Sequence, residues 1–269
     1  MKRRLSWWMA GIVAGGMMAG LAGCKPKPAP KNPEPATTTS SAPAQPAVQL
    51  NPATLGTISG TVHFAGKPPE RLRIDMSQDP VCSMLGGENF AEQYVVHDGK
   101  LANVYIYIKS GPPAAMSAPA TSTAPVVLDQ KGCKYVPHVI ALMRGGSVEF
   151  RNSDATMHNI HTMPTVAGNK EIDVSEGPRG APQVRQFPQP EVMMPVRCNN
   201  HPWMNAFINV SPTPFFAVTD ASGHFEIKGL PEGTYTLAAV HEKMGEQDIT
   251  VTVKPQATET ANFTYSLKK

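Results

Sequence analysis

The sequence from Cys198 to Met204 reads CNNHPWM and lies between two short apolar runs, 192–197 and 206–210. Both runs are rich in β-branched and other apolar residues, which indicates two strands joined by a tight turn. A turn of this length brings a thiolate, an imidazole and a thioether close together. We therefore expect Cys198, His201 and Met204 to face a single point at one end of a sheet.

Two more imidazoles, those of His158 and His161, follow the run 147–152 (SVEFRN). One thiolate, two imidazoles and a weak thioether form the ligand set of a type 1 copper site. We predict His158, Cys198 and His201 as the three strong ligands and Met204 as the axial one. His161 could replace His158, but we place it beside the site instead.

Zinc also binds cysteine and histidine, and this alternative stays open. Structural zinc sites use more than one thiolate in most cases, and methionine is not among the usual zinc ligands. The donor set therefore favours copper, with one ion per chain.

Around these residues the sequence resembles the cupredoxins, and most closely the amicyanin and plastocyanin branch. The resemblance covers 125–212 and rests on three motifs: GSVEFRN (146–152), MHNIH (157–161) and CNNHPWM (198–204). It implies a Greek-key β-barrel and the ligands named above. It also implies that Asn159 hydrogen-bonds the ligand loop, that Pro202 and Trp203 form an apolar mouth, and that the edge of His201 is exposed as the electron port. The long polar stretch between His161 and the run 192–197 resembles nothing in that family.

A second resemblance lies near the C-terminus, where TDASGHFEI (219–227) and LPEGTYTL (230–237) have the turn and strand pattern of the carboxypeptidase regulatory-like domain. This family has a small transthyretin-like β-sandwich fold. The runs 58–64 and 103–108 resemble the first strands of the same domain. We therefore predict a nested arrangement, with the sandwich built from 56–110 and 213–267 around a cupredoxin domain at 125–212. Sequential domains are the simpler alternative.

Many short alternating runs, with 27 prolines and 22 glycines, predict an all-β chain without long helices. The expected strands are 57–64, 101–109, 125–128, 139–143, 147–152, 192–197, 206–210, 216–219, 224–228, 235–241, 248–253 and 260–265. His241 and Glu242 follow one of them and are expected to be a pair on the rim.

The first 24 residues have the features of an export signal. A basic start at 2–4 precedes an apolar stretch that ends in LAGC (21–24), which resembles the lipobox of bacterial lipoproteins. The resemblance implies cleavage before Cys24 and lipidation of its sulfur. Lys25 after Cys24 favours the outer membrane if the cell is Gram-negative. An ordinary secretory signal or an anchor helix is the alternative.

The segment 25–55 is rich in Pro, Ala and Thr and is expected to be a disordered tether. A similar composition at 111–125 predicts a second linker or long loop. We expect an exported protein in the periplasm or at the cell surface, held by a lipid anchor.

The formal net charge of +3 comes from the N-terminal segment. The first fifty residues hold six basic side chains and one acidic one, a net +5, so the remainder carries about −2. No basic patch is left to bind nucleic acid, and we expect no such partner.

Four cysteines are divided among three roles. With Cys24 lipidated and Cys198 on copper, Cys82 and Cys133 form a candidate disulfide in an oxidising compartment. Two free buried thiols are one alternative, and a second metal site of Cys133 with His138 is another.

We expect a type 1 copper protein that carries single electrons between protein partners of cytochrome, quinoprotein or oxidase type, and that is not an enzyme. The sequence lacks the paired His-x-His motifs of a multicopper oxidase and the second loop cysteine of a dinuclear copper centre. A copper carrier or storage protein is the first rival. A lipoprotein that binds carbohydrate or peptide through its sandwich is the second.

Overall fold

The computed structural model describes residues 50–85, 88–120 and 124–267. The predicted export signal, Cys24 and most of the predicted tether lie outside these residues. The described part confirms the all-β prediction, because strands dominate and its two α-helices have only five and four residues, α1 (Pro80–Met84) and α2 (Pro113–Met116). A short 3-10 helix, η1, spans Pro52–Thr54. No helix in the described ranges is long and apolar enough to cross a membrane.

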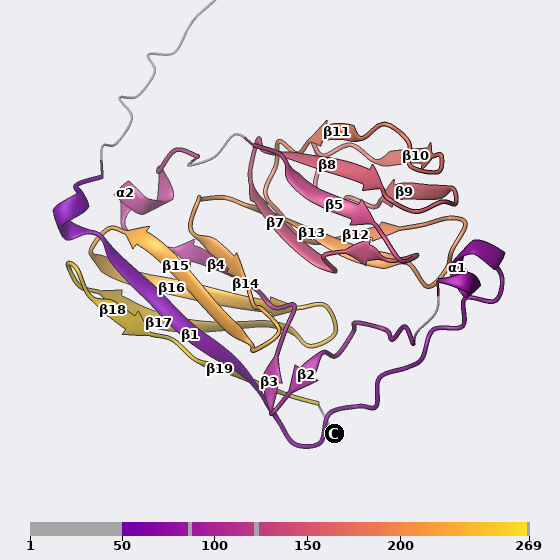
Figure 1. Cartoon of the computed structure of the whole chain (residues 1–269). Helices are drawn as coiled ribbons and strands as arrows, with labels where there is room; N and C mark the ends of the chain where they lie inside the picture. The colour runs from indigo at the N-terminus through magenta and orange to yellow at the C-terminus, as the bar shows by residue number, and fades with distance from the viewer. Residues whose placement is uncertain (1–49, 86–87, 121–123, 268–269) are drawn as a thin grey trace, which may run out of the picture. The chain divides into compact units, whose positions relative to one another are not determined.

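One pair of sheets, the flanking sandwich, is built from the two ends of the described chain (Figure 1). Its first sheet contains β1 (Gly56–Ala65), β2 (Val96–His97), β3 (Lys100–Leu101), β15 (His224–Leu230), β18 (Thr258–Thr260) and β19 (Phe263–Ser266). Its second sheet contains β4 (Tyr105–Ser110), β14 (Phe216–Val218), β16 (Gly233–His241) and β17 (Gly245–Val253). Apolar side chains of both sheets form one buried core.

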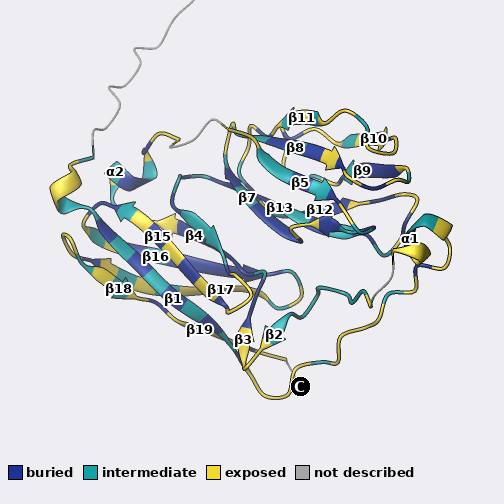
Figure 2. Cartoon of the chain, viewed as in Figure 1, coloured by how far each residue is buried: buried dark blue, intermediate teal, exposed yellow. Residues whose placement is uncertain are grey.

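The other pair of sheets, the central sandwich, is built from the middle of the chain. Its five-stranded sheet has the order β10-β9-β12-β13-β7, with bounds Ile172–Glu176, His158–Thr162, Glu191–Arg197, Asn205–Ser211 and Val139–Met143. Its four-stranded sheet has the order β11-β8-β5-β6, with bounds Gln183–Gln186, Ser147–Asn152, Val126–Gln130 and Tyr135–Val136. A second buried core lies between these sheets, and Figure 2 shows the buried positions along their strands.

The strands depart from the predicted runs at several places. The run 101–109 is divided into β3 and β4, because Asn103 between them has a φ of 62° in the left-handed region. The run 260–265 is divided into β18 and β19. The polar stretch after His161, which the sequence left unassigned, contributes β10 and β11 to the central sandwich.

The division of β18 from β19 depends on a close approach to β1. A Cβ atom on Gly60 would lie 1.5 Å from the carbonyl oxygen of Ala261, so only glycine fits at this point of β1. Next to it, the side chain of Asn262 accepts a 2.9 Å hydrogen bond from the backbone N–H of Thr61. The chain can therefore pass from one pairing with β1 to the next without losing the edge hydrogen bonds.

The two sandwiches are in contact through a small apolar cluster. Tyr105, Tyr107, Ala238 and Val240 of the flanking sandwich are buried there, and Ala141 and Met193 of the central sandwich pack against them.

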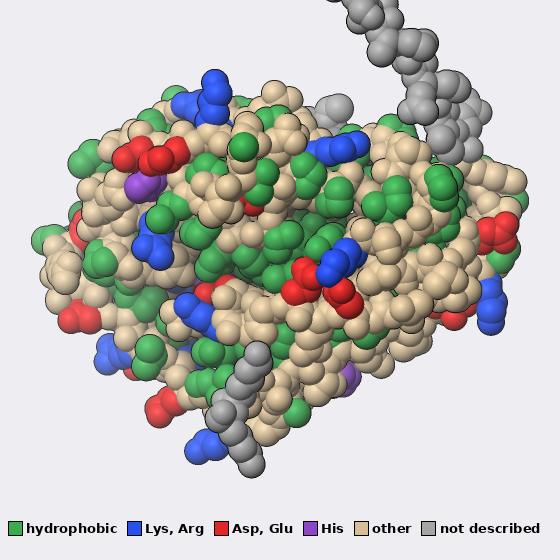
Figure 3. Space-filling view, turned by 180° about the vertical axis from the view of Figure 1, so that it is seen from behind, with side chains coloured by type: hydrophobic (Ala, Val, Ile, Leu, Met, Phe, Trp, Pro, Cys, Tyr) green, Lys and Arg blue, Asp and Glu red, His purple; other side chains and the backbone are tan. Residues whose placement is uncertain are grey.

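Seen from behind, acidic and basic side chains are interspersed rather than grouped by sign (Figure 3).

His241 and Glu242 are not the rim pair that the sequence predicted. His241 is only 2% exposed and its ring lies near those of Tyr94 and Tyr265. Its Nδ1 accepts a 3.2 Å hydrogen bond from the N–H of Lys243. Burial lowers the pKa of His241 to about 4, although the neighbouring Glu242 acts in the opposite direction.

A buried neutral histidine makes the stability of the fold depend on pH. The pKa of His241 is below its ordinary value of 6.5, so the unfolded chain binds the additional proton first as the pH falls. We expect the free energy of unfolding to drop between pH 6.5 and 4, by roughly 3 kcal/mol at most. Urea unfolding at several pH values would measure it.

The matched variant is His241→Asn, whose side-chain oxygen can still accept the hydrogen bond from Lys243. This variant should have a flatter pH profile between pH 6.5 and 4, whatever its absolute stability. Parallel profiles for both proteins would show that His241 does not cause the dependence.

Candidate metal centre

Three of the four predicted ligands converge at one end of the central sandwich. His158 is the first residue of β9, and Cys198 and His201 lie on the loop between β12 and β13, the ligand loop (198–204). Their ligand atoms all lie within 4.8 Å of one another. The Nδ1 atom of His201 is 2.9 Å from that of His158 and 3.6 Å from the sulfur of Cys198.

The site is shielded from water. His158 is fully buried, and Cys198 and His201 are 4% and 3% exposed. Met204, the predicted axial ligand, is buried in the same core. Its backbone closes the loop, because its N–H donates to the carbonyl of His201 at 2.9 Å and its carbonyl accepts from the N–H of Cys198 at 3.3 Å.

In each of the two imidazoles, the Nε2 atom is within hydrogen-bond distance of an aspartate. Nε2 of His158 is 2.8 Å from a carboxylate oxygen of Asp154, and Nε2 of His201 is 3.0 Å from one of Asp79. Each aspartate thus fixes the orientation of its ring and leaves Nδ1 facing the thiol. The sequence analysis singled out neither carboxylate.

The two aspartates are joined through a disulfide. Asp154 accepts a 2.8 Å hydrogen bond from the N–H of Cys133, and Asp79 accepts one of 3.2 Å from the N–H of Cys82. The structure links Cys82 to Cys133 by a disulfide with a Cα–Cα distance of 5.7 Å. The sulfur of Cys82 is 3.9 Å from Nε2 of His201.

These contacts favour a thiolate on Cys198 beside a protonated His158, which would have to release that proton before its Nδ1 could bind a metal ion. Burial opposes ionisation of Cys198, but the hydrogen bonds from His158 and from backbone N–H groups hold the pKa of its thiol below the ordinary value. Burial also acts against a charge on His158, yet Asp154 and Cys198 outweigh it and raise the pKa of His158 to about 9. For Asp79, hydrogen bonds from His201 and the N–H of Cys82 outweigh burial and lower its pKa to about 2.

The covering of His201 differs from what the cupredoxin resemblance implies. The sequence analysis expected the edge of this ring to be exposed as an electron port, and that expectation is wrong. Residues 71–85, the cap segment, extend from the flanking sandwich and place Asp79 and Cys82 over the ring. Figure 1 shows α1, which belongs to this segment, beside the end of the central sandwich.

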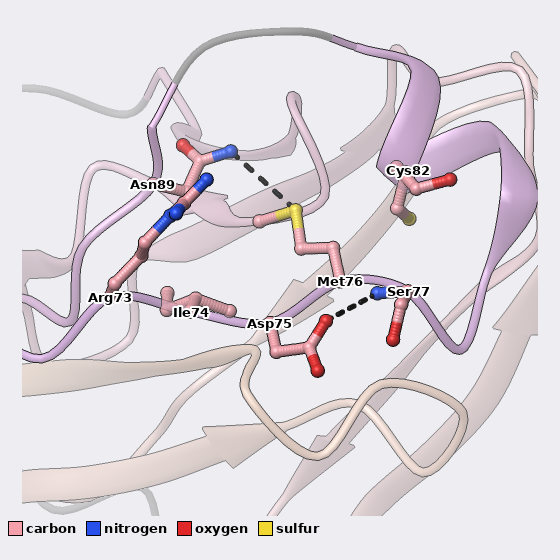
Figure 4. A pocket seen from close by; sticks show the side chains of 8 residues that line it. Arg73, Ile74, Asp75, Met76, Ser77, Cys82 and Asn89 are labelled. Carbon is pink, nitrogen blue, oxygen red and sulfur yellow. Dashed lines mark hydrogen bonds between the residues drawn. The ribbon is translucent and has the colours of Figure 1, made fainter.

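Hydrogen bonds within the cap segment and from Asn89 hold its backbone and side chains (Figure 4). The carboxylate of Asp75 accepts from the N–H of Ser77 at 2.9 Å, and the sulfur of Met76 accepts from the side-chain amide of Asn89 at 3.5 Å. A pocket of about 370 Å³ on this segment is lined by these residues and by Cys82. None of the four predicted ligands is among the residues that line it.

The other residues predicted near the site take three different positions. Asn159 is buried, and its side-chain oxygen accepts from the N–H of Asn199 in the ligand loop at 3.3 Å. His161 faces away from the cluster, toward Asn199 and Glu171. Pro202 is exposed.

Trp203 is partly buried, and its ring centroid is 5.0 Å from that of His201. Its indole N–H donates to the carbonyl of Cys133 at 3.0 Å. The predicted mouth of the site is therefore closed on this side by Trp203. The alternative metal site of Cys133 with His138 is not formed, because Cys133 is in the disulfide and Nε2 of His138 contacts Glu242.

Comparison with known families bears on both halves of the chain. Residues 197–266 match the family model of the carboxypeptidase regulatory-like domain. The predicted resemblance to this domain is thereby confirmed, although the match begins at 197 and not at 213. In the structure, β13 lies inside the matched range but pairs with strands of the central sandwich.

Solved structures similar to part of the chain include two whose titles name copper and one whose title names a cupredoxin. The copper-containing nitrite reductase of Thermus scotoductus SA-01 is 26% identical over 37% of this chain, with a TM-score of 0.30, and the match spans 25% of the reductase. A Cu(I) structure of an amicyanin mutant is 22% identical over 39% of this chain and 97% of its own, with a TM-score of 0.29. A purple cupredoxin from Nitrosopumilus maritimus is 20% identical over 32% of this chain and 99% of its own, with a TM-score of 0.27. No curated protein matches the chain.

The disulfide should control how easily the ligand loop is reached. The bond closes a loop with a sequence separation of 51 residues and holds the cap segment over His201. In a Cys24→Ala background, Cys198 is the free thiol, and we expect it to react slowly with a thiol reagent such as DTNB. Replacing Cys82 and Cys133 by serine should accelerate this reaction about tenfold or more, because the cap opens locally at lower cost.

The control is Leu237→Ala, which destabilises the flanking sandwich without touching the cap segment, since Leu237 is fully buried in the flanking core. Its thiol reaction should stay slow while the fold is populated. Equal rates for the serine variant and the parent would show that the disulfide does not close the site.

Proposed function

We propose that this protein is an exported, lipid-anchored type 1 copper protein that carries single electrons between redox partners. The observation that supports this most strongly is the buried convergence of two imidazole Nδ1 atoms and one thiol, from His158, His201 and Cys198. Copper would supply a one-electron couple at this point. The chain itself contributes a donor set of fixed orientation.

The donor set fits copper by its chemistry. A soft thiolate together with imidazoles suits copper. Structural zinc sites prefer more than one thiolate, and this cluster has only that of Cys198. Hydrogen bonds to Asp154 and Asp79 hold both rings in place in the absence of any ligand bond. A site held rigidly by its surroundings changes little between two oxidation states, and such a site suits electron transfer.

In this proposal, electrons do not enter through an exposed edge of the His201 ring, because that ring is buried. With that ring under the cap segment, the aromatic ring beside it is that of Trp203, which is partly exposed. We place the port on the side of the ligand loop that carries Trp203. The partners remain those expected from the sequence, redox proteins of cytochrome, quinoprotein or oxidase type.

The proposed location depends on Cys24 and the segment that follows it. A lipid on Cys24 would hold the protein at a membrane facing an oxidising compartment, and the segment 25–55 would act as a tether. An oxidising compartment also suits the disulfide of Cys82 and Cys133.

The first test is spectroscopic. The purified protein should bind one equivalent of Cu(II) and show an intense blue thiolate-to-copper band with narrow hyperfine splitting in its EPR spectrum. Cys198→Ser should abolish the blue band, because no other described cysteine is free. His161→Gln should keep it, since His161 lies outside the cluster.

Three outcomes would contradict the proposal in different ways. A Cys198→Ser variant that stays intensely blue would overturn the ligand assignment. A colourless protein that binds copper and loses it quickly to a competing chelator would favour the copper carrier. A protein that binds no copper would leave the flanking sandwich as the candidate for a binding function.

The carboxylate of Asp79 should lower the reduction potential. A negative charge on the outer nitrogen of a ligand ring stabilises the more highly charged Cu(II) state over Cu(I). We expect Asp79→Asn, which keeps the shape of the side chain, to raise the potential measured by voltammetry. A tenfold change in the one-electron equilibrium corresponds to about 59 mV.

Asp75→Asn is the matched control on the same cap segment. The carboxylate of Asp75 is exposed and accepts from the N–H of Ser77, so its loss should leave the potential unchanged. An equal shift in both variants would mean that the effect is one of general surface charge. No shift in Asp79→Asn would contradict the role of this carboxylate.

A further inference from the structure

A buried ion pair connects the flanking sandwich to the central sandwich. Nε2 of His138 is 2.7 Å from a carboxylate oxygen of Glu242, and both side chains are 3% exposed. His138 lies just before β7 of the central sandwich, and Glu242 lies just after β16 of the flanking sandwich. A charge buried to this degree is stable only if it is paired and hydrogen-bonded.

Both ring nitrogens of His138 lie within hydrogen-bond distance of an oxygen atom. Nε2 faces the carboxylate of Glu242, and Nδ1 is 3.2 Å from the backbone carbonyl of Asn205. The carbonyl of Asn205 is an acceptor, so Nδ1 donates to it. Glu242 places a carboxylate against the opposite side of the ring, and its other oxygen is 3.6 Å from the amine of Lys243.

His138 holds the backbone that follows Met204 from two sides. Its Nδ1 donates to the carbonyl of Asn205, and its own carbonyl accepts from the N–H of Phe207 at 2.9 Å. The ring also contacts the ring of Phe207 edge to face, with centroids 5.7 Å apart. The side-chain amide of Asn205 donates in turn to the carbonyl of Trp203 at 3.1 Å.

These hydrogen bonds enclose Met204. Trp203, the residue before it, and Asn205, the residue after it, are both held by hydrogen bonds. The bond to Asn205 comes from His138, whose Nε2 contacts the carboxylate of Glu242 in the other sandwich. In type 1 sites, the axial ligand and the groups around the thiolate tune the reduction potential. A change in the backbone next to Met204 should therefore change the copper centre as well as the fold.

We propose that Glu242 is a positioning residue for the copper site, which acts through His138 on the backbone beside the axial ligand Met204. The flanking sandwich thereby tunes the metal centre of the central sandwich. This inference rests on the proposed copper function. It assigns to the carboxypeptidase regulatory-like part of the chain a role in the redox properties of the site.

The test uses Glu242→Gln in the purified copper-loaded protein. Glutamine keeps the length of the side chain and can accept one hydrogen bond, but it removes the negative charge that faces Nε2 of His138. We expect a change in EPR hyperfine splitting and a shift of up to tenfold in the one-electron equilibrium, about 59 mV. Met204→Leu gives the reference shift for a lost axial ligand.

The matched control is Glu246→Gln in the same β16–β17 hairpin. Glu246 contacts Lys109 and Tyr107 and does not reach the ligand loop. Its loss should leave both the potential and the EPR spectrum unchanged. His138→Gln, alone and combined with Glu242→Gln, completes a double-mutant cycle in which the combined variant should shift no further than His138→Gln alone.

The outcomes separate this inference from the proposed function. If Glu242→Gln lowers the unfolding midpoint but keeps the potential and EPR spectrum of the parent, the ion pair only anchors the two sandwiches and the inference is wrong. If Glu242→Gln does not fold, His138→Gln decides the same question by the same two measurements. If the parent protein shows no type 1 spectrum, the proposed function fails instead.

Discussion

The hydrogen bond between Nε2 of His201 and the carboxylate of Asp79 joins the two halves of this molecule at the metal centre. The bond between Cys82 and Cys133 holds the cap segment, which carries Asp79, beside the ligand loop. Asp154 repeats the arrangement on His158, with the N–H of Cys133 as its other partner. One covalent bond thus holds the two carboxylates that orient both rings.

The ligand loop is constrained from a second direction. Asn159 holds its start through the N–H of Asn199, and His138 holds the backbone after its end through the carbonyl of Asn205. Glu242 of the flanking sandwich completes this second set of contacts. The orientation of the donors therefore depends on residues from both sandwiches, and the flanking sandwich is more than a spacer between the site and the N-terminal segment.

The local part of the site could be predicted from sequence, and the long-range part could not. Cys198 and His201 share one loop, so their spacing alone brings them together, and the strand before His158 indicates where its side chain starts. Asp79 is separated from His201 by 122 residues, and no periodicity connects them. His241 and Glu242 were misplaced on the rim for a similar reason: the end of their strand is covered, by Tyr94 and Tyr265 at His241 and by His138 of the central sandwich at Glu242. Asn103 divides a predicted strand through its left-handed backbone conformation. The prediction missed this division because an apolar run gives no sign of such a conformation.

The pairing of β1 has a consequence for what supports the covering of the site. This strand, the first of the described chain, is hydrogen-bonded to β15, β18 and β19, which lie toward the other end of the described residues. Contacts of such high sequence separation form late, because the ends of a long loop must first meet. The base from which the cap segment extends is therefore held by strands from both ends of the described chain. The ligand loop, by contrast, closes on itself through the backbone of Met204, so its own shape and its covering by Asp79 depend on contacts of very different sequence separation.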